Sequence, residues 1–409
     1  MSRAIFSANN KVGQVFSFQT NVTSGSTFDP TVTFLSGSDR VSWDLGNGNL
    51  VAGNSLSYTF TGNTGTTKTI KLKTNRLNKL NQFQSDTDGI IGRLDMSKWT
   101  NLGGFFNVDN NSNLTGITHT YSSQIFTAYY ASNCNLTGNL DLSMFSNFGG
   151  DIRITNNPKL TSVINTASTR SITVYDVSFC NLTGNIDLSI FTNLSGGIYL
   201  NNNINLTGIT YTSTTNIIGQ YVLNNCNLTG NHNLSMFSNL GGYFDISNNS
   251  GLTSVTHANT SRVNTIYYAH NCNLTGNHNL ATFPNFSGQF AIFNNPNLTG
   301  ITHTSSTRTF TTYQAYSCNL GYVNFKPLSG ATFKNSPISL HNNNMVASDV
   351  NHILDDFKNI TVANSTRWSG VTLNIGGTNQ DPDTSSGGYN GLAAITTLTG
   401  SPYNWSITY

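Results

Sequence analysis

The sequence predicts a mainly β protein built around a parallel β-solenoid, and two observations carry this prediction. The 409-residue chain repeats with a period of 46 residues, and only 9% of its residues are charged. Glu, a strong helix former, is absent, whereas Asn, Gly, Ser and Thr are abundant, which disfavours a mainly helical fold. A hydrophobic content of 37% supplies enough apolar surface for a large core, so wholesale disorder is not expected.

The repeat is clearest in its cysteines, which follow one another at identical intervals of 46: Cys134, Cys180, Cys226, Cys272 and Cys318. A tyrosine lies five residues before each cysteine: Tyr129, Tyr175, Tyr221, Tyr267 and Tyr313. Each block divides into two similar halves of about 23 residues, the length of one solenoid coil. Repeats of this kind bury their apolar side chains only when they stack, so residues 86–345 are expected to form the solenoid.

Each half contains one short strand, and alternate residues of a strand point to the same side. The expected inward residues are Tyr175, Val177 and Leu182 in one half, and Ile152, Ile154 and Leu160 in the other. An asparagine at the turn of the second half should satisfy backbone groups of the neighbouring loop. Its copies are Asn157, Asn203, Asn249 and Asn295.

The segments 175–184 and 152–160 resemble the leucine-rich-repeat consensus, in which alternating apolar residues are followed by Asn or Cys and then Leu. The resemblance covers roughly residues 88–345, with one extra residue before the leucine in many second halves. It implies a parallel β-solenoid with one strand per coil.

Residues 1–85 do not follow the repeat, and their alternating apolar runs predict a small antiparallel sandwich. The segment Trp43-Asp-Leu-Gly-Asn-Gly48, followed by Ser57-Tyr-Thr-Phe60, resembles the PKD-type immunoglobulin-like module, although Asn47 replaces the second Asp of that motif. The resemblance implies an anchor or a spacer. The runs are 15–20, 31–35, 41–45, 56–60 and 68–73.

Residues 346–409 are expected to cap the solenoid, since an exposed last coil needs cover. Helical spacing predicts a helix over 347–357 with Ser348 as its N-cap, and a second helix over 389–398. Strands are expected at 371–375 and 405–409. This end of the chain also resembles the ends of repeat proteins in the virions of tailed phages that infect Bacteroidota.

No cofactor, metal or catalytic site is expected. Equivalent cysteines would lie about 9–10 Å apart, beyond disulfide reach, so we expect buried, reduced thiols. No catalytic motif occurs, and no cluster of carboxylates or basic residues is evident that would suit a glycan-degrading enzyme. We expect surface positions for an aspartate column, with a calcium site as its alternative, and for two histidine columns. These columns are Asp95, Asp141 and Asp187; His232 and His278; and His119, His257 and His303.

The outward strand face varies between copies, and it is the candidate binding surface. Aromatic and polar groups in this pattern suit recognition of a protein or a glycan, or contact with a neighbouring subunit, and the sequence leaves both open. The candidate binding residues are Tyr130, Arg153, Tyr199, Tyr243, Tyr268, His270, Phe293 and Tyr316. Asp176 and Asp245 are expected on the same face.

The leading hypothesis is a non-enzymatic structural protein of a phage virion, such as a fibre, baseplate or head-decoration component that contacts the host surface. An adhesin-like composition whose first ten residues lack an apolar export segment favours assembly in a host cytoplasm. Expected partners are other virion proteins, copies of the chain, or a host glycan or protein. A net charge of +2 without a basic run disfavours nucleic acid, and no apolar stretch is long enough for membrane insertion. The alternatives are a secreted bacterial leucine-rich-repeat adhesin and a glycan-degrading solenoid enzyme.

Overall fold

The computed structural model describes residues 13–36, 39–61, 66–165, 167–211, 217–257, 262–281 and 286–409. The protein is mainly β, with 45% of residues in strands and 9% in helices. It contains a parallel β-solenoid of about 11 turns, which confirms the mainly β class and the solenoid of the predicted fold. Two compact units divide the chain, Met1–Asn181 (unit 1) and Leu182–Tyr409 (unit 2).

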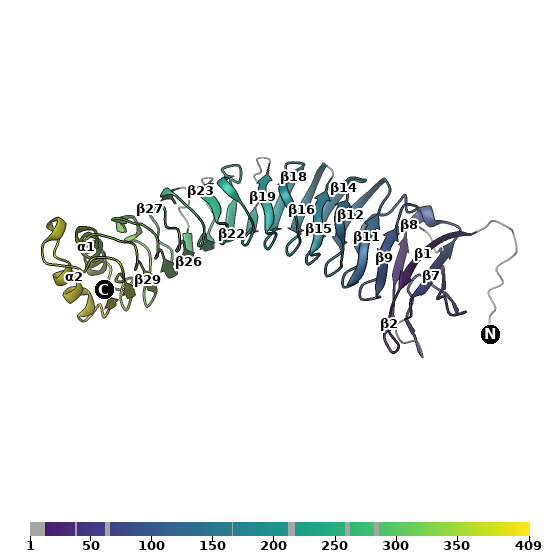
Figure 1. Ribbon diagram of the computed structural model, residues 1–409, viewed down its shortest axis with the longest axis horizontal. Helices are drawn as coiled ribbons and strands as arrows, with labels where there is room; N and C mark the ends of the chain where they lie inside the picture. The colour runs from purple at the N-terminus through teal and green to yellow at the C-terminus, as the bar shows by residue number, and fades with distance from the viewer. Residues whose placement is uncertain are drawn as a thin grey trace. The chain divides into compact units, whose positions relative to one another are not determined.

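Unit 1 begins with antiparallel strands that run into the first coils of the solenoid (Figure 1). One sheet has the order β5-β4-β7-β1 and continues through an antiparallel pairing of β1 with β9. The second begins where β3 pairs antiparallel with β8, which in turn pairs parallel with β10. Strand pairing therefore continues across residue 85. The strands are β1 (Gln14–Thr20), β2 (Thr27–Phe28), β3 (Thr31–Phe34), β4 (Ser42–Asp44), β5 (Leu50–Ala52), β6 (Tyr58–Thr59), β7 (Lys68–Thr74), β8 (Leu80–Gln84) and β9 (Ile90–Asp95), with a 3-10 turn at Leu77–Lys79.

The coils of unit 1 place one parallel ladder on each side of the solenoid. The longer ladder runs β8-β10-β12-β14-β16, and the opposite side contains the pairs β9-β11 and β13-β15. Phe16, Phe83 and Trp99 join the N-terminal strands to the first coil, with ring centroids 5.2 to 5.8 Å apart. The strands are β10 (Gly104–Asn107), β11 (Asn113–Thr118), β12 (Ser122–Tyr130), β13 (Thr137–Asp141), β14 (Phe145–Arg153), β15 (Lys159–Ile164) and β16 (Ser168–Asp176).

Unit 2 repeats this plan and ends in the C-terminal cap. Its long ladder runs β18-β20-β22-β24-β26-β28-β29-β30-β31, and the opposite side holds the pairs β17-β19, β21-β23 and β25-β27. The strands are β17 (Thr183–Asp187), β18 (Phe191–Tyr199), β19 (Asn205–Thr210), β20 (Ile218–Val222), β21 (Thr229–Leu234), β22 (Leu240–Asp245), β23 (Gly251–His257), β24 (Asn264–Tyr268), β25 (Gly276–Asn279), β26 (Phe286–Ala291), β27 (Leu298–Thr302), β28 (Phe310–Gln314), β29 (Pro337–Ser339), β30 (Thr372–Asn374) and β31 (Ser406–Thr408).

The cap consists of two helices and the last two strands. In helix α1 (Ala347–Ala363) the N-cap position is occupied by Val346, whose side chain makes no capping hydrogen bond. The prediction of Ser348 as N-cap is therefore wrong, because Ser348 lies in the first turn. Helix α2 (Gly391–Thr399) is capped by Asn390, whose side chain accepts a 2.9 Å hydrogen bond from the Ala393 N–H. Short 3-10 turns occur at Lys326–Leu328 and Ser386–Gly388.

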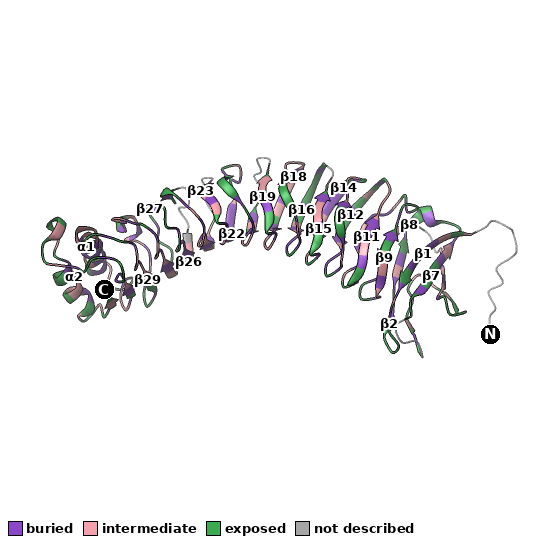
Figure 2. Ribbon diagram, in the orientation of Figure 1, coloured by how far each residue is buried: buried purple, intermediate pink, exposed green. Residues whose placement is uncertain are grey.

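The core has the composition that the repeat predicts. All five tyrosines of the column are fully buried, as are Ile152, Ile154 and Val177, and buried and exposed residues alternate along the strands (Figure 2). The asparagine side chains close each coil onto its neighbours: Asn157 Nδ2 donates to the carbonyls of Ala131 and Ile154, both at 2.9 Å. Its Oδ1 accepts from the Leu136 N–H at 3.1 Å. The predicted inward residues and the predicted role of the turn asparagines are both confirmed.

One glycine in each 46-residue block allows a β-bulge in the long ladder, where the strand comes close to the neighbouring strand. Gly150 has a φ of 71°, and the ladder register shifts between Gly150 and Asp151. A Cβ atom on Gly150 would lie 1.8 Å from the Thr127 carbonyl oxygen, and one on Gly242 would lie 2.1 Å from that of Gly219. Only glycine fits this combination of backbone angle and close approach.

Candidate functional site: the outward strand face

Four aromatic rings stack on the outward face of unit 2, one from each of four successive coils. We call His270, Phe293, Tyr316 and His341 the aromatic ladder. Their centroids are 4.4, 4.5 and 4.4 Å apart, and neighbouring ring planes differ by only 5°, 3° and 11°. Parallel pairing brings equivalent side chains of adjacent strands about 4.8 Å apart, which is the separation that stacked rings prefer. All four side chains are partly buried.

A row of asparagines lies next to the aromatic ladder in sequence. We call Asn248, Asn271 and Asn294 the amide ladder. Each has a left-handed backbone, with φ between 55° and 58°, a conformation that Asn tolerates better than most residues. Asn271 Nδ2 donates to Asn248 Oδ1 at 2.8 Å, and Asn294 Nδ2 donates to Asn271 Oδ1 at 2.7 Å. The chain thus presents parallel rows of ring edges and amides.

The outward tyrosines nearer the start of unit 2 lie along the sheet. Tyr199 covers Gly197, where a Cβ atom would come within 2.4 Å of the ring, and its hydroxyl contacts Gln220 of the next coil. Tyr268 reaches Gln289 in the same way and lies 5.8 Å from the ring of His270. Tyr243 packs edge-on against Tyr268 at 6.2 Å. These rings are therefore held by the scaffold as well as exposed to a partner.

The outward face of unit 2 has little charge. Asp245 lies between the inward-facing, fully buried Phe244 and Ile246, as the alternation predicts, but it is only 5% exposed, and its Oδ1 accepts from both the N–H and the hydroxyl of Ser247. Burial lowers the pKa of His270, with Asp245 opposing the shift, and burial also lowers the pKa of His341. Both imidazoles are consequently neutral at pH 7.

The two candidate residues in unit 1 belong to a small charged cluster that the sequence reading missed. Arg153 pairs with Asp151 at 2.9 Å and lies over the Tyr130 ring, 5.6 Å from its centroid. The Tyr130 hydroxyl donates to the same Asp151 carboxylate at 3.4 Å, and Thr173 donates to its other oxygen. The cluster forms because three adjacent strands place these residues in register; their separation in the sequence hid it. Arg153 is the one candidate residue that is largely exposed.

The prediction that the histidine columns lie on the surface is wrong. His232, His257 and His278 are only 5 to 7% exposed, and His119 and His303 are partly buried. Their Nε2 atoms contact the hydroxyls of the buried tyrosine column. Tyr267 bonds both His257 at 2.8 Å and His278 at 2.7 Å, Tyr129 bonds His119 at 2.8 Å, and Tyr313 bonds His303 at 3.0 Å.

A buried tyrosine hydroxyl needs a hydrogen-bond partner, and this requirement explains where the histidines lie. Tyr175 bonds Asn165 at 3.1 Å, and Tyr221 bonds Tyr211 at 2.7 Å as well as His232. Burial lowers the pKa of His232 and of His278 to about 4. Each tyrosine has one partner ten residues before it, and His232 and His278 follow their tyrosines by eleven residues; these fixed intervals are the sequence signal that could have revealed the contacts.

The cysteine and aspartate columns are structural. All five thiols are free and buried, as predicted, and Cys134 Sγ donates to the Val108 carbonyl at 3.3 Å. Burial raises the pKa of the Cys134 thiol to about 12. Asp95 and Asp187 are exposed, and each caps a turn by accepting from the N–H two residues on. Among the described residues no group of three His, Cys, Asp or Glu could hold a metal ion.

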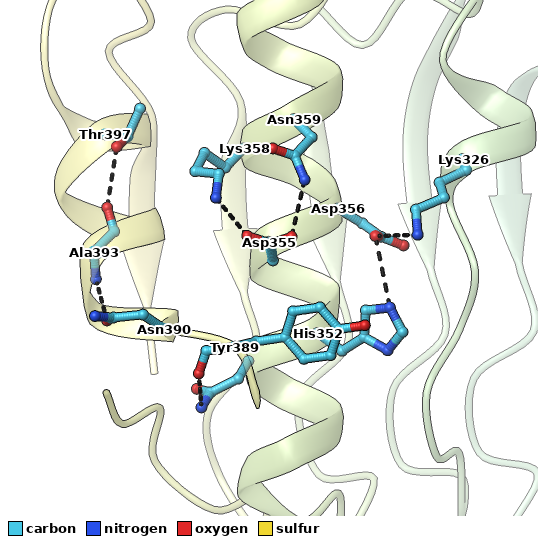
Figure 3. A network of polar contacts seen from close by, with 11 residues as sticks. Lys326, His352, Asp355, Asp356, Lys358, Asn359, Tyr389, Asn390, Ala393 and Thr397 are labelled. Atoms are coloured by element: carbon cyan, nitrogen blue, oxygen red, sulfur yellow. Dashed lines mark hydrogen bonds and ion pairs between the residues drawn. The ribbon is translucent and has the colours of Figure 1, made fainter. Parts of the chain in front are cut away.

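The cap holds a buried carboxylate of its own. Asp356 is 1% exposed and pairs with Lys326 at 3.0 Å, while His352 Nε2 lies 3.8 Å away, too far for a hydrogen bond (Figure 3). The Tyr322 hydroxyl donates to Asp356 at 2.5 Å. The His352 ring lies between the rings of Tyr322 and Tyr389, at 3.8 and 4.1 Å. These contacts join α1 to the segments on either side of it.

Sequence reasoning missed one member of the aromatic ladder, His341. It lies within the predicted solenoid but follows Tyr316 by 25 residues, whereas the earlier steps are 23, so the sequence did not show that it aligns with Tyr316. A search against models of known protein families finds no match for this chain, and a search of curated proteins finds no relative. Within the described residues, no helix has the length and apolar character needed to cross a bilayer.

Proposed function

We propose that the protein is a non-enzymatic structural and recognition component whose outward strand face contacts a partner. The observation that carries this proposal is the aromatic ladder, because it holds four rings in fixed positions on a sheet face. Rings fixed in this way lose little conformational entropy on binding. His270, Phe293 and Tyr316 belong to the ladder, and Tyr268 and Tyr243 lie beside it. Tyr199 lies nearer the start of unit 2, and Tyr130 and Arg153 form a separate cluster.

We place this component in the virion of a tailed phage, as a fibre, baseplate or head-decoration protein. The adhesin-like composition and the resemblance of the C-terminal end to virion repeat proteins support the assignment. Mass spectrometry of purified particles tests it. The peptides of this chain should be present at a fixed copy number per particle, and their absence from purified particles would reject the assignment.

A secreted bacterial adhesin is the second candidate, since the same face would serve cell attachment. Fractionation of the producing cells separates the two. An adhesin should appear in the culture medium or at the cell surface without a phage infection, whereas a virion component should appear only in infected cells.

The finer classification belongs to the same proposal. The solenoid is of leucine-rich-repeat type, supported by the alternating inward residues followed by a buried Asn or Cys that bonds the neighbouring coil. The N-terminal module is immunoglobulin-like, supported by its antiparallel strand pairs around Trp43 and Phe28, which are both fully buried. It would serve as the anchor.

A further inference from the structure

We infer that the aromatic and amide ladders of unit 2 form a binding track for an uncharged polysaccharide. The inference rests on the proposed recognition function and names the chemical class of its ligand. It follows from which atoms the two ladders leave exposed, from the charge of the surrounding face, and from the spacing of the coils.

The ladders expose atoms that attract uncharged oxygen. Stacking at 4.4 to 4.5 Å covers the ring faces of Phe293 and Tyr316 on both sides and leaves their edges outward. Ring edges carry partial positive charge, whereas ring faces are negative. In the amide ladder, each step uses one N–H of the donor and the carbonyl oxygen of its neighbour, so a second N–H remains on each amide. Hydroxyl and ether oxygens complement both rows.

The charge of the face selects against ionic ligands. In the described strands β22 to β30, the outward positions carry neither Lys nor Arg. The Asp245 carboxylate is buried and satisfied by Ser247, and both ladder histidines are neutral at pH 7. A sulfated or acidic polymer would find no cation there, and an anion that lost its water without a partner would bind weakly.

The same geometry favours a sugar chain over a protein. Interface hot spots usually insert an aromatic or arginine side chain into a desolvated pocket, whereas the ladder rings already cover one another's apolar faces. Successive coils are about 4.8 Å apart, similar to the length of one sugar ring. A polymer lying across the strands could therefore repeat the same contacts from coil to coil.

The test uses the full-length protein in native gels that contain soluble polysaccharides. Dextran, galactomannan and xylan serve as uncharged probes, and dextran sulfate is the charged counterpart of dextran. We expect at least one uncharged polymer to retard the wild-type protein, and dextran sulfate to retard it no more than dextran does. The joint change Phe293→Ala and Tyr316→Ala should lower the apparent affinity, measured from the retardation at increasing polysaccharide concentration, at least tenfold. Ile204→Ala, at an apolar residue of the same unit that is 69% exposed and belongs to neither ladder nor to the candidate binding residues, should not.

A second variant keeps the test decisive if the double change unfolds the coil. Asn294→Asp removes the amide donors while preserving size and tolerance of the left-handed backbone. It should weaken retardation several-fold while the melting temperature stays within a few degrees. Lack of retardation by all uncharged probes, retardation by dextran sulfate alone, or unchanged binding by the ladder variants would overturn the inference. So would a wild-type oligomer that the double change converts to monomer, since the ladder would then join copies of the chain.

Failure here is separable from failure of the proposed function. A protein that is present in purified particles but binds none of the probes would lose only its polysaccharide ligand. A protein that binds a probe through the ladder but is absent from particles would lose only its place in the virion.

Discussion

At the residue scale, asparagine does several different jobs in this protein, and each depends on its backbone position. Asn249 is fully buried and bonds four backbone groups. Asn248, its neighbour, adopts a left-handed backbone and joins the amide ladder. Asn233 replaces the turn-capping aspartate and accepts from the Ser235 N–H at 3.0 Å. The abundance of this residue is therefore a structural requirement of the repeat.

The buried asparagines should be essential for stability. Asn249→Ala leaves the Leu228 N–H and the carbonyls of Leu223 and Ile246 without their side-chain partner. An unsatisfied buried group costs about 1–3 kcal/mol, so we expect a loss of about 3 kcal/mol in the free energy of unfolding, measured by denaturant titration. Asn227→Ala, at an exposed position, should change stability little. Equal effects of the two changes would contradict the assigned role.

Phe179 occupies a position that Asn holds in the preceding coils of unit 1. Its φ is 53°, and its side chain is 52% exposed. A bulky residue in this conformation costs about 1–2 kcal/mol. We expect Phe179→Asn to raise the free energy of unfolding by about 1 kcal/mol and the melting temperature by a few degrees. Asn156→Phe should do the reverse, and a Phe179→Asn variant that melts lower would show that Phe179 contributes packing instead.

At the element scale, the partners of the buried tyrosines vary between coils, although the tyrosines and the strands do not. His278 has its counterparts in Leu140 and Ile186, and His257 has its counterpart in Asn165. Residues found at the equivalent position of another copy are therefore substitutions that a coil is expected to tolerate. They allow the interior polar contacts to be altered without redesign of the core.

The buried histidines should make the protein sensitive to acid. The pKa of His278 falls from 6.5 to about 4 on burial, so its contribution is present above pH 6.5 and is lost as the pH falls towards 4. One such group contributes up to about 3 kcal/mol. We expect the melting temperature to drop between pH 6.5 and 4, and His278→Leu to reduce that drop. An unaltered pH profile would show that the imidazole stays neutral or remains solvated.

Asp88 lies at the junction of the N-terminal strands with the solenoid. Its effect on the pH dependence of stability should have the opposite sign to that of His278. It is fully buried, and burial raises its pKa from 3.8 to about 7. Its contribution is present below pH 3.8 and is lost as the pH rises to 7. We expect Asp88→Asn to stabilise the protein at pH 8 by a few kcal/mol, with little effect at pH 4. The amide can still accept from the Asp29 N–H, which bonds Asp88 at 2.9 Å.

At the scale of the whole molecule, the N-terminal strands of unit 1 extend both of its sheets and cover the first coil. Loss of residues 1–85 would remove β1 from β9 and β8 from β10 and would uncover Trp99, which is fully buried. Exposed strand edges promote association. We expect this truncated chain to aggregate, as measured by light scattering. A monomeric product with unchanged melting would show that the solenoid closes its own end.

The sequence predicted the features that the repeat constrains. Tyr175, Val177 and Asn157 recur in phase, and stacking demands that they face inward. It did not predict contacts that depend on neighbouring coils or on broken periodicity. His278 read as a polar surface residue because its partner, the Tyr267 hydroxyl, lies elsewhere in the chain. His341 follows a longer coil, and Asp151 meets Arg153 and Tyr130 only through the register of three strands.

Because each 46-residue block has its bulge glycine and its buried asparagine at the same positions, we expect the blocks to be interchangeable. Unequal recombination inside the gene could therefore add or remove a block while leaving its new neighbours with familiar surfaces. Proteins that arise from such events would differ first in the number of 46-residue blocks and only later in the sequence of a block.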